Sequence, residues 1–468
     1  MSTEKHSDIE TSGSSQGQSQ DGNWSPPTDI IGALDWDGPD DPDNPMNWPS
    51  WKKILHSAIP AIYSFGLATC ISTFVAAIPI IQLQFDVSRT ASLMVVSLYT
   101  VGFVIGPCIA SPYPNFASDN FKVLVIFRFL AGVGGSGVLA VGAGTLSDLW
   151  KPQQVGRVAI AYILAPFLGP SIGPLIGAYT LHEYHNHWKW AVWVVLCILA
   201  PVGISLPFMK ETSKERILYA RAKTRGHQFP EETFSVTLSK IGKGFLKPLH
   251  MCVAEPVAIC IGLYTAFSFA MVFSFFGSYA YVYTKVYHFN MRQIGLCYIP
   301  VIIGFLFAVA TFGFFDATKY RKEAIRTNNR VAPEFRLYSA LVGCWLVPIG
   351  LFWYAWAPHE NVHWIVPVLA GFPFGWGTLA NFLACMAYIV DTYGTANGAS
   401  AVAANGILRF LLGAAFPLFI FQVYQKMGIH WAGSLFAFIS VAFIPVPWIF
   451  FLKGPELRKR SHYSTATY

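Results

Sequence analysis

Long apolar runs are the feature that most restricts what this chain can fold into. Eleven stretches of about twenty or more residues are nearly free of charge, and a helix of that length spans the roughly 30 Å hydrocarbon core of a bilayer. Only 12% of the residues are charged, about half of what a soluble surface carries. We therefore predict an all-α membrane protein, with spans at roughly 54–82, 90–113, 122–147, 158–180, 189–208, 257–283, 293–315, 337–357, 363–389, 398–424 and 431–452.

Lysine and arginine residues collect at the ends of these runs and indicate which ends face the cytoplasm. The longest loop holds nine of them and the loop at 316–336 holds six. Because cytoplasmic loops carry the excess of positive charge, we predict both loops inside, with two membrane halves between cytoplasmic termini. The predicted parts are a disordered tail at 1–50, a first membrane half at 51–208, a basic loop at 209–254, a six-helix half at 255–452 and a tail at 453–468.

Several classes of function are disfavoured by what the sequence lacks. The net charge of +7 lies beside the apolar runs and in no nucleic-acid-binding motif, so we expect no nucleic-acid partner. Neither a GxxxxGK[ST] phosphate loop nor a catalytic signature is present, so we predict no ATP drive, no enzyme activity and no cofactor. HEYHNH at 182–187 lacks the HExxH spacing and is interpreted as a loop without a metal.

Targeting and redox signals are sparse as well. Seven of the eight cysteines lie within apolar runs, which argues against a disulfide framework. The first apolar run follows about fifty polar residues, so we predict no cleavable signal peptide and expect the first membrane helix to serve as the insertion signal.

The first half has an odd number of runs, which conflicts with the charges at its ends. Counting back from the cytoplasmic loop at 148–157, the first run would begin outside, whereas Lys52 and Lys53 mark its start as cytoplasmic. Residues 90–122 are too few for two spans, which need about 40 residues. One helix is therefore predicted to be missing, with the gap at about Pro107 to Ile109.

Two halves joined by a basic loop resemble the major facilitator superfamily, and several motifs resemble its fungal drug:proton antiporter branch. The motifs are WDGPDDPDNPMNWPSWKK, RFLAGVGGSGVLAVGAGTLSDLW, GPSIGPLIGA, PEFRL, YIVDTYG, SAVAANGILRF and GPELRKRS. Together they cover roughly residues 35–463 and imply a twelve-span fold, of which about eleven helices are expected here. The family's Gly- and Arg-rich motif and the third helix that follows it are absent, and Ala178 replaces the last glycine of the third motif.

The fifth apolar helix of the intact family corresponds to APFLGPSIGPLIGAY at 165–179. Glycines and prolines each recur every fourth residue here, so each set forms a narrow stripe on a helix: Gly169, Gly173 and Gly177, and Pro166, Pro170 and Pro174. Small residues let helices approach closely in lipid, and prolines weaken the helix they interrupt. We expect this helix to pack against the other half as a deformable seal; ordinary helix packing is the alternative.

Two arginines lie within predicted spans, where ionisable residues are costly and usually face a cavity. Arg128, followed by Gly132 in the same motif, corresponds by the resemblance to the family's membrane arginine. Arg409 lies well inside run 398–424. Each could pair with a carboxylate or hold a backbone carbonyl, and the alternative is a structural or snorkelling side chain.

The proton and substrate routes have several candidates in the second half. Glu255 and Asp391 could exchange protons, although a helix cap or a solvated charge is the commoner role at a helix end. Asn381 and Tyr388 are candidate substrate contacts. They accompany an aromatic wall suited to amphipathic organic molecules, formed by Tyr264, Phe267, Phe269, Phe273, Phe276 and Trp376.

The resulting hypothesis is a secondary transporter that exports a small organic compound, such as a drug, toxin or secondary metabolite, in exchange for protons. The alternative is a transport-inactive or truncated relative that lacks the third helix. We expect a monomer that crosses the plasma membrane many times, with the vacuolar membrane as the alternative location and both termini cytoplasmic in an intact relative.

Overall fold

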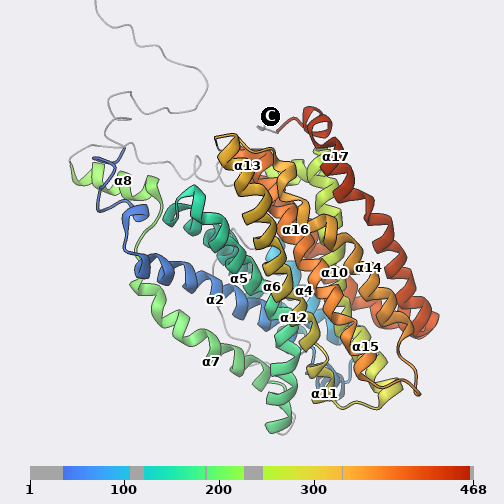
Figure 1. Cartoon of the computed structure of the whole chain (residues 1–468). Coiled ribbons are helices and arrows are strands. Elements are labelled where there is room, and N and C mark those ends of the chain that lie inside the picture. The colour runs from blue at the N-terminus through green and yellow to red at the C-terminus, as the bar shows by residue number, and fades with distance from the viewer. Residues whose placement is uncertain (1–34, 106–120, 185–186, 226–245, 329, 464–468) are drawn as a thin grey trace, which may run out of the picture.

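The computed structural model describes residues 35–105, 121–184, 187–225, 246–328 and 330–463, and helices dominate all of them (Figure 1). The helices of the first half are α2 (Ser50–Thr73), α3 (Ile78–Phe85), α4 (Arg89–Ile105), α5 (Phe121–Leu149), α6 (Pro152–Glu183) and α7 (Trp190–Ser205). The short helix α8 (Lys214–Thr224) follows them, and a 3-10 turn, η1 (Pro45–Asn47), precedes them.

The second half contains longer helices. They are α10 (Pro256–Tyr287), α11 (Met291–Leu296), α12 (Ile299–Phe315), α13 (Arg321–Arg326), α14 (Tyr338–Trp356), α15 (Ile365–Leu369), α16 (Gly371–Phe443) and α17 (Pro445–Lys459), with a π-turn, η4 (Asp316–Tyr320), and a 3-10 turn, η5 (Pro333–Arg336). Two glycines divide α16 into three segments, because Gly394 and Gly428 have φ angles of 59° and 79° that other residues rarely adopt.

Each predicted apolar run overlaps at least one helix of the described residues. Nine helices within the described residues are long and apolar enough to cross a membrane. One of the nine, Asn397–Lys459, contains two of the predicted runs, and Gly428 separates them. Run 90–113 corresponds to a shorter apolar helix at Arg89–Val104.

The helices run between two ends of the molecule, which Figure 1 distinguishes. The helices α8 and α13 and the C-terminal end of the described chain lie at one end, which we call the basic end. The short helices α11 and α15 lie at the opposite end, which we call the far end. The described helices of the two basic loops, α8 and α13, therefore lie at the same end of the molecule.

Helices α4 and α5 run parallel to each other, although they are consecutive in the described chain. Arg128 contacts the Val95 carbonyl, and one turn further along both helices Gly132 packs against the Tyr99 carbonyl. The contacts advance in the same direction on both helices. The predicted gap at Pro107 to Ile109 lies outside the described residues, and the missing helix stays a prediction.

Helix α6 continues through all three of its internal prolines, and its glycine stripe faces α2. A Cβ added at Gly169 would come within 2.5 Å of Ala68 Cβ, and one at Gly177 within 2.5 Å of the Thr73 carbonyl oxygen. At Gly173 an added Cβ would collide with Ser72 Oγ. The glycines therefore let α6 pack closely on a helix of its own half.

This corrects part of the expectation for the fifth helix. The glycine stripe does not face the second half, although other residues of α6 do. Gly295 of α11 packs against Leu175 and Pro174, and Phe167 contacts helices of the second half. The spacing showed which residues share a face, but it carried no information on which helix lies opposite.

Replacing a glycine of the stripe by a larger residue should destabilise the first half. Gly173→Leu places a side chain where Ser72 now lies, and we expect it to lower the free energy of unfolding by about 1–3 kcal/mol. Gly144→Leu on α5 is the matched control, because nothing lies within 4 Å of a Cβ added there. Thermal unfolding of the detergent-solubilised chain measures both. Equal melting temperatures for the two variants would contradict this packing.

Candidate functional site

Buried aromatic side chains join the two halves near the middle of the molecule. Phe167 of α6 lies against the second half, with ring-centroid distances of 4.7 Å to Phe382 and 5.7 Å to Phe269. Phe103 of α4 stacks on Phe410 of α16 at 5.3 Å. Such rings bury large apolar areas and form the contact between the halves at this depth. The aromatic wall predicted for α10 therefore faces the first half at Phe269.

At the far end the halves also contact through backbone and polar groups. A Cβ on Gly295 of α11 would come within 3.0 Å of Leu175 Cα on α6, so these two helices are in backbone contact. Gln422 of α16 donates a hydrogen bond from Nε2 to Thr90 Oγ1 at 2.7 Å. These contacts hold α6 and α4 of the first half against α11 and α16 of the second.

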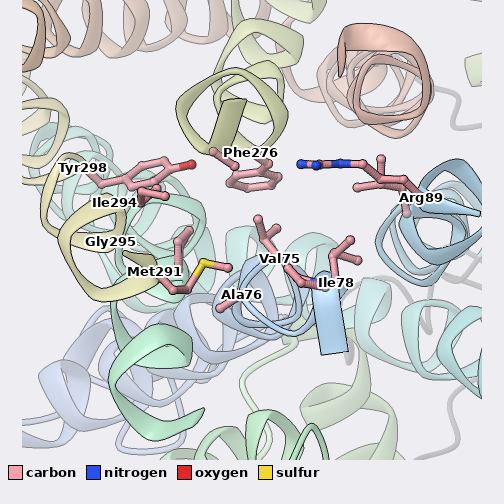
Figure 2. A pocket seen from close by; sticks show the side chains of 13 residues that line it. Val75, Ala76, Ile78, Arg89, Phe276, Met291, Ile294, Gly295 and Tyr298 are labelled. Atoms are coloured by element: carbon pink, nitrogen blue, oxygen red, sulfur yellow. The ribbon is translucent and has the colours of Figure 1, made fainter. Parts of the chain in front are cut away.

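A small cavity lies between the halves at the same end and is lined by residues of both (Figure 2). Figure 2 shows the Arg89 guanidinium and the Tyr298 hydroxyl pointing from opposite sides toward the Phe276 ring. Pro174, from the proline stripe of α6, also lines it. Its volume of about 30 Å³ accommodates a water molecule or two, whereas drug-sized ligands occupy about 300 Å³ or more. The far end is therefore closed around this cavity.

Arg128 is fully buried inside the first half and is well supplied with partners. Its Nη2 donates to the Cys70 carbonyl at 2.9 Å, its Nη1 to Cys70 Sγ at 3.2 Å and its Nε to the Val95 carbonyl at 3.4 Å. The guanidinium lies 3.8 Å from the Phe74 ring centroid and 4.5 Å from that of Tyr99. Of the roles left open by the sequence, the structure supports the one in which Arg128 holds backbone carbonyls.

Arg409 lies on the middle segment of α16, where three phenylalanine rings surround its guanidinium. Its guanidinium is 4.7 Å from the Phe410 ring centroid, 4.8 Å from Phe382 and 5.2 Å from Phe269. Its Nε is buried without a hydrogen-bond partner. Arg409 thus belongs to the aromatic contact between the halves.

Glu255 is a fully buried carboxylate that binds the C-terminal segment. Its Oε2 accepts hydrogen bonds from Tyr393 Oη at 3.0 Å and from Ser461 Oγ at 2.5 Å, and its Oε1 accepts one from the His462 amide at 2.8 Å. Glu255 stands at the N-cap position of α10, but its side chain makes no cap hydrogen bond. Neither of the commoner interpretations, a cap or a solvated charge, is therefore correct for this residue.

Asp391 is held by ionic contacts at the basic end. Arg336 donates from Nε to Asp391 Oδ2 at 2.8 Å and from Nη1 to Asp316 Oδ1 at 2.8 Å. This arginine therefore ties α16 to η4, and the second of its carboxylates also meets Arg321 at 3.4 Å. Asp391 is neither a cap nor a solvated charge but one member of an ion-pair network.

The remaining candidates are buried at separate positions. Asn381 packs against Gly343 of α14, and neither its Nδ2 nor its Oδ1 has a hydrogen-bond partner. The Tyr388 ring packs on Phe450 of α17 at 5.7 Å. The predicted site residues are thus divided among the basic end, the middle and the far end, and form no single cluster.

The acidic segment 35–43 docks on α8 at the basic end. The guanidinium of Arg221 is bound by both oxygens of Asp41, at 2.7 and 2.9 Å, and by Asp43 at 2.6 Å. Arg225 meets Asp37 at 2.6 Å. The hydrogen bond from Arg221 holds the pKa of Asp41 below its ordinary value of 3.8. We call this arrangement the acidic clasp.

Two features of the site were missed by the sequence predictions. The acidic clasp had a visible signal, because residues 35–41 contain four aspartates and the longest loop contains nine of the 32 Lys and Arg residues. Arg89 had none, since it lies between two apolar runs and has the sequence context of an ordinary loop arginine. Its place in the cavity follows only from the packing of α4 against α16.

The fold and the closed contact between the halves define the class of this protein. It is a multi-pass membrane protein built of two helical halves. The sequence profile of the Major Facilitator Superfamily matches residues 94–417, which is more than half of the chain.

Fungal transporters are similar to this chain over nearly its whole length. Polyamine transporter 4 of Saccharomyces cerevisiae is 33% identical, with 92% of this chain and 73% of the relative covered. The ascochitine biosynthesis cluster MFS transporter of Didymella fabae is 31% identical, covering 92% and 89%. Efflux pump radE of Floropilus chiversii is 32% identical, covering 92% and 85%. The chain belongs to the Major Facilitator Superfamily.

The acidic clasp should open in acid and on loss of Arg221. Because folding lowers the pKa of Asp41, its contribution to docking is present above the usual carboxyl range and is lost as the pH falls below about 4. Spin labels at the exposed positions Asp40 and Lys223 report the distance between segment and helix. We expect a narrow distribution at pH 7 that broadens in acid, and a broad one at pH 7 in Arg221→Gln. A narrow distribution in that variant would show that the clasp does not hold the segment.

Proposed function

We propose that this chain exports a small organic compound in exchange for protons, by alternating exposure of a site between its two halves. The observation that carries the proposal is the closed, two-sided contact at the far end, where α6 and α4 meet α11 and α16 around a cavity of about 30 Å³. A substrate can cross the molecule only if these contacts at the far end separate. Helix α6 takes part in these contacts and also packs in the core of its own half.

The resemblance in sequence to proteins named as efflux pumps and transporters supports the direction of transport. The aromatic side chains at the contact suit an organic compound with apolar surface. We place the protein in the plasma membrane as a monomer, with the basic end in the cytoplasm, because cytoplasmic loops carry the excess of Lys and Arg.

Glu255 is the residue that we assign to proton exchange. The three groups that donate hydrogen bonds to its carboxylate are neutral, namely a phenol, a hydroxyl and an amide. Protonation of Glu255 therefore leaves no cation unpaired. Asp391 is less suited, because its proton would have to compete with the guanidinium of Arg336 at 2.8 Å.

A liposome assay tests this assignment and the transport function together. The full chain is reconstituted, a pH gradient is imposed, and the movement of fluorescent dyes across the membrane is followed. We expect gradient-driven movement to fall at least about tenfold in Glu255→Gln, because the amide keeps the shape of the carboxyl group but cannot carry the proton. Glu456→Gln, which removes an exposed carboxylate on α17, is the matched control and should transport normally.

Two outcomes would contradict the proposal, one for the proton-exchange residue and one for transport itself. Undiminished pH-driven movement in Glu255→Gln would remove this residue from the proton route. The absence of gradient-driven movement of any dye by the unmodified chain would favour the alternative, in which the protein is a transport-inactive relative that lacks the third helix.

A further inference from the structure

Three arginines on the membrane helices, the buried Arg128 and the partly buried Arg89 and Arg409, differ in their hydrogen bonding. Arg128 makes three hydrogen bonds, two of them to backbone carbonyls. Arg409 and Arg89 each have a buried Nε without a partner, and neither forms an ion pair with any carboxylate of the described chain. A guanidinium stays charged in proteins, and a charge in a low-dielectric interior is costly unless an anion accompanies it. The fold therefore provides acceptors for Arg128, whereas it leaves the buried Nε of Arg89 and that of Arg409 without one.

Aromatic rings surround both unsatisfied arginines. Arg409 lies within 5.2 Å of three phenylalanine rings, and the Arg89 guanidinium lies 3.7 Å from the ring centroid of Phe421. The face of a ring attracts a cation, but such a contact is worth only about 0.5–2 kcal/mol and accepts no directed hydrogen bond. The rings therefore hold each guanidinium in place and leave its donors available to a bound group.

A row of rings on α10 links the two positions. Phe269 contacts Arg409, Phe273 follows one turn later at 4.9 Å from Phe269, and Phe276 follows at 5.1 Å from Phe273. Phe276 then faces Arg89 in the far-end cavity, as Figure 2 shows. Seven residues of helix correspond to about 10 Å, so one apolar row extends from the middle of the molecule to its closed end.

We propose that the exported compound is an organic anion with an aromatic or apolar body. Its acidic group pairs with Arg409 while its apolar part lies on the Phe269 to Phe276 row, and it passes Arg89 when the far end opens. This inference rests on the proposed export function and adds the charge of the substrate to it. Polycations are disfavoured along the same row, because the guanidinium groups of Arg409 and Arg89 repel them and no carboxylate is among the described residues that line the far-end cavity.

Two xanthene dyes of opposite charge test the proposal. Fluorescein is an anion at pH 7.5, and rhodamine 123 is a cation on nearly the same ring system. Binding to the detergent-solubilised full chain is measured by fluorescence polarisation. We expect the unmodified chain to bind fluorescein more tightly than rhodamine 123. Arg409→Gln should weaken fluorescein binding about tenfold or more without weakening rhodamine 123 binding, because it removes only the charge-assisted pairing.

Further variants separate a lost charge from a damaged fold. Arg409→Lys keeps the charge and should retain most of the fluorescein binding. Lys453→Gln removes an exposed cation on α17, away from the contact between the halves, and should change neither dye. Arg89→Gln should slow fluorescein export in liposomes while binding at Arg409 persists.

The possible failures are distinguishable from those of the export function. Tighter binding of rhodamine 123 than of fluorescein, no fluorescein binding at millimolar concentration, or unchanged fluorescein binding in Arg409→Gln would each overturn the anion assignment. Gradient-driven movement of rhodamine 123 alone would overturn it and leave proton-coupled export standing. Fluorescein binding without movement under a pH gradient would instead overturn export and leave the anion site standing.

Discussion

A bilayer interior provides no partners for polar groups, and this constraint governs both the scaffold and the site. The backbone satisfies it by forming helices along every described apolar run. Arg128 satisfies it by donating to the Cys70 and Val95 carbonyls, which fixes α5 against α2 and α4. Among the buried polar atoms that the fold leaves without a partner, the Nε atoms of Arg89 and Arg409 belong to charged groups, which are the costliest to leave unpaired.

The fold was largely predictable because hydropathy reports directly on the solvent. Apolar length located the helices, and the placement of Lys and Arg gave the alternation that brings α8 and α13 to the same end. The contact of the glycine stripe was not predictable in the same way. Spacing assigned Gly169, Gly173 and Gly177 to one helix face, but only the packed structure shows that α2 covers it.

The site was less predictable, because its residues acquire their roles from partners far away in sequence. Glu255 had the sequence context of a helix cap, yet its carboxylate binds Ser461 and the His462 amide, which are more than two hundred residues away. Arg409 was a candidate because it interrupts an apolar run. Its sequence context alone did not reveal that rings, and not carboxylates, surround it.

The central claim is that both basic loops lie on one side of the membrane and that the two halves cross it between them. Single cysteines at Lys223, Lys322 and His359, in a background without other cysteines, report sidedness in intact cells through a membrane-impermeant maleimide. We expect His359, at the far end, to react from outside, and Lys223 and Lys322 to react only after the cells are permeabilised. Labelling of Lys223 and Lys322 from opposite sides would contradict the two-half transporter.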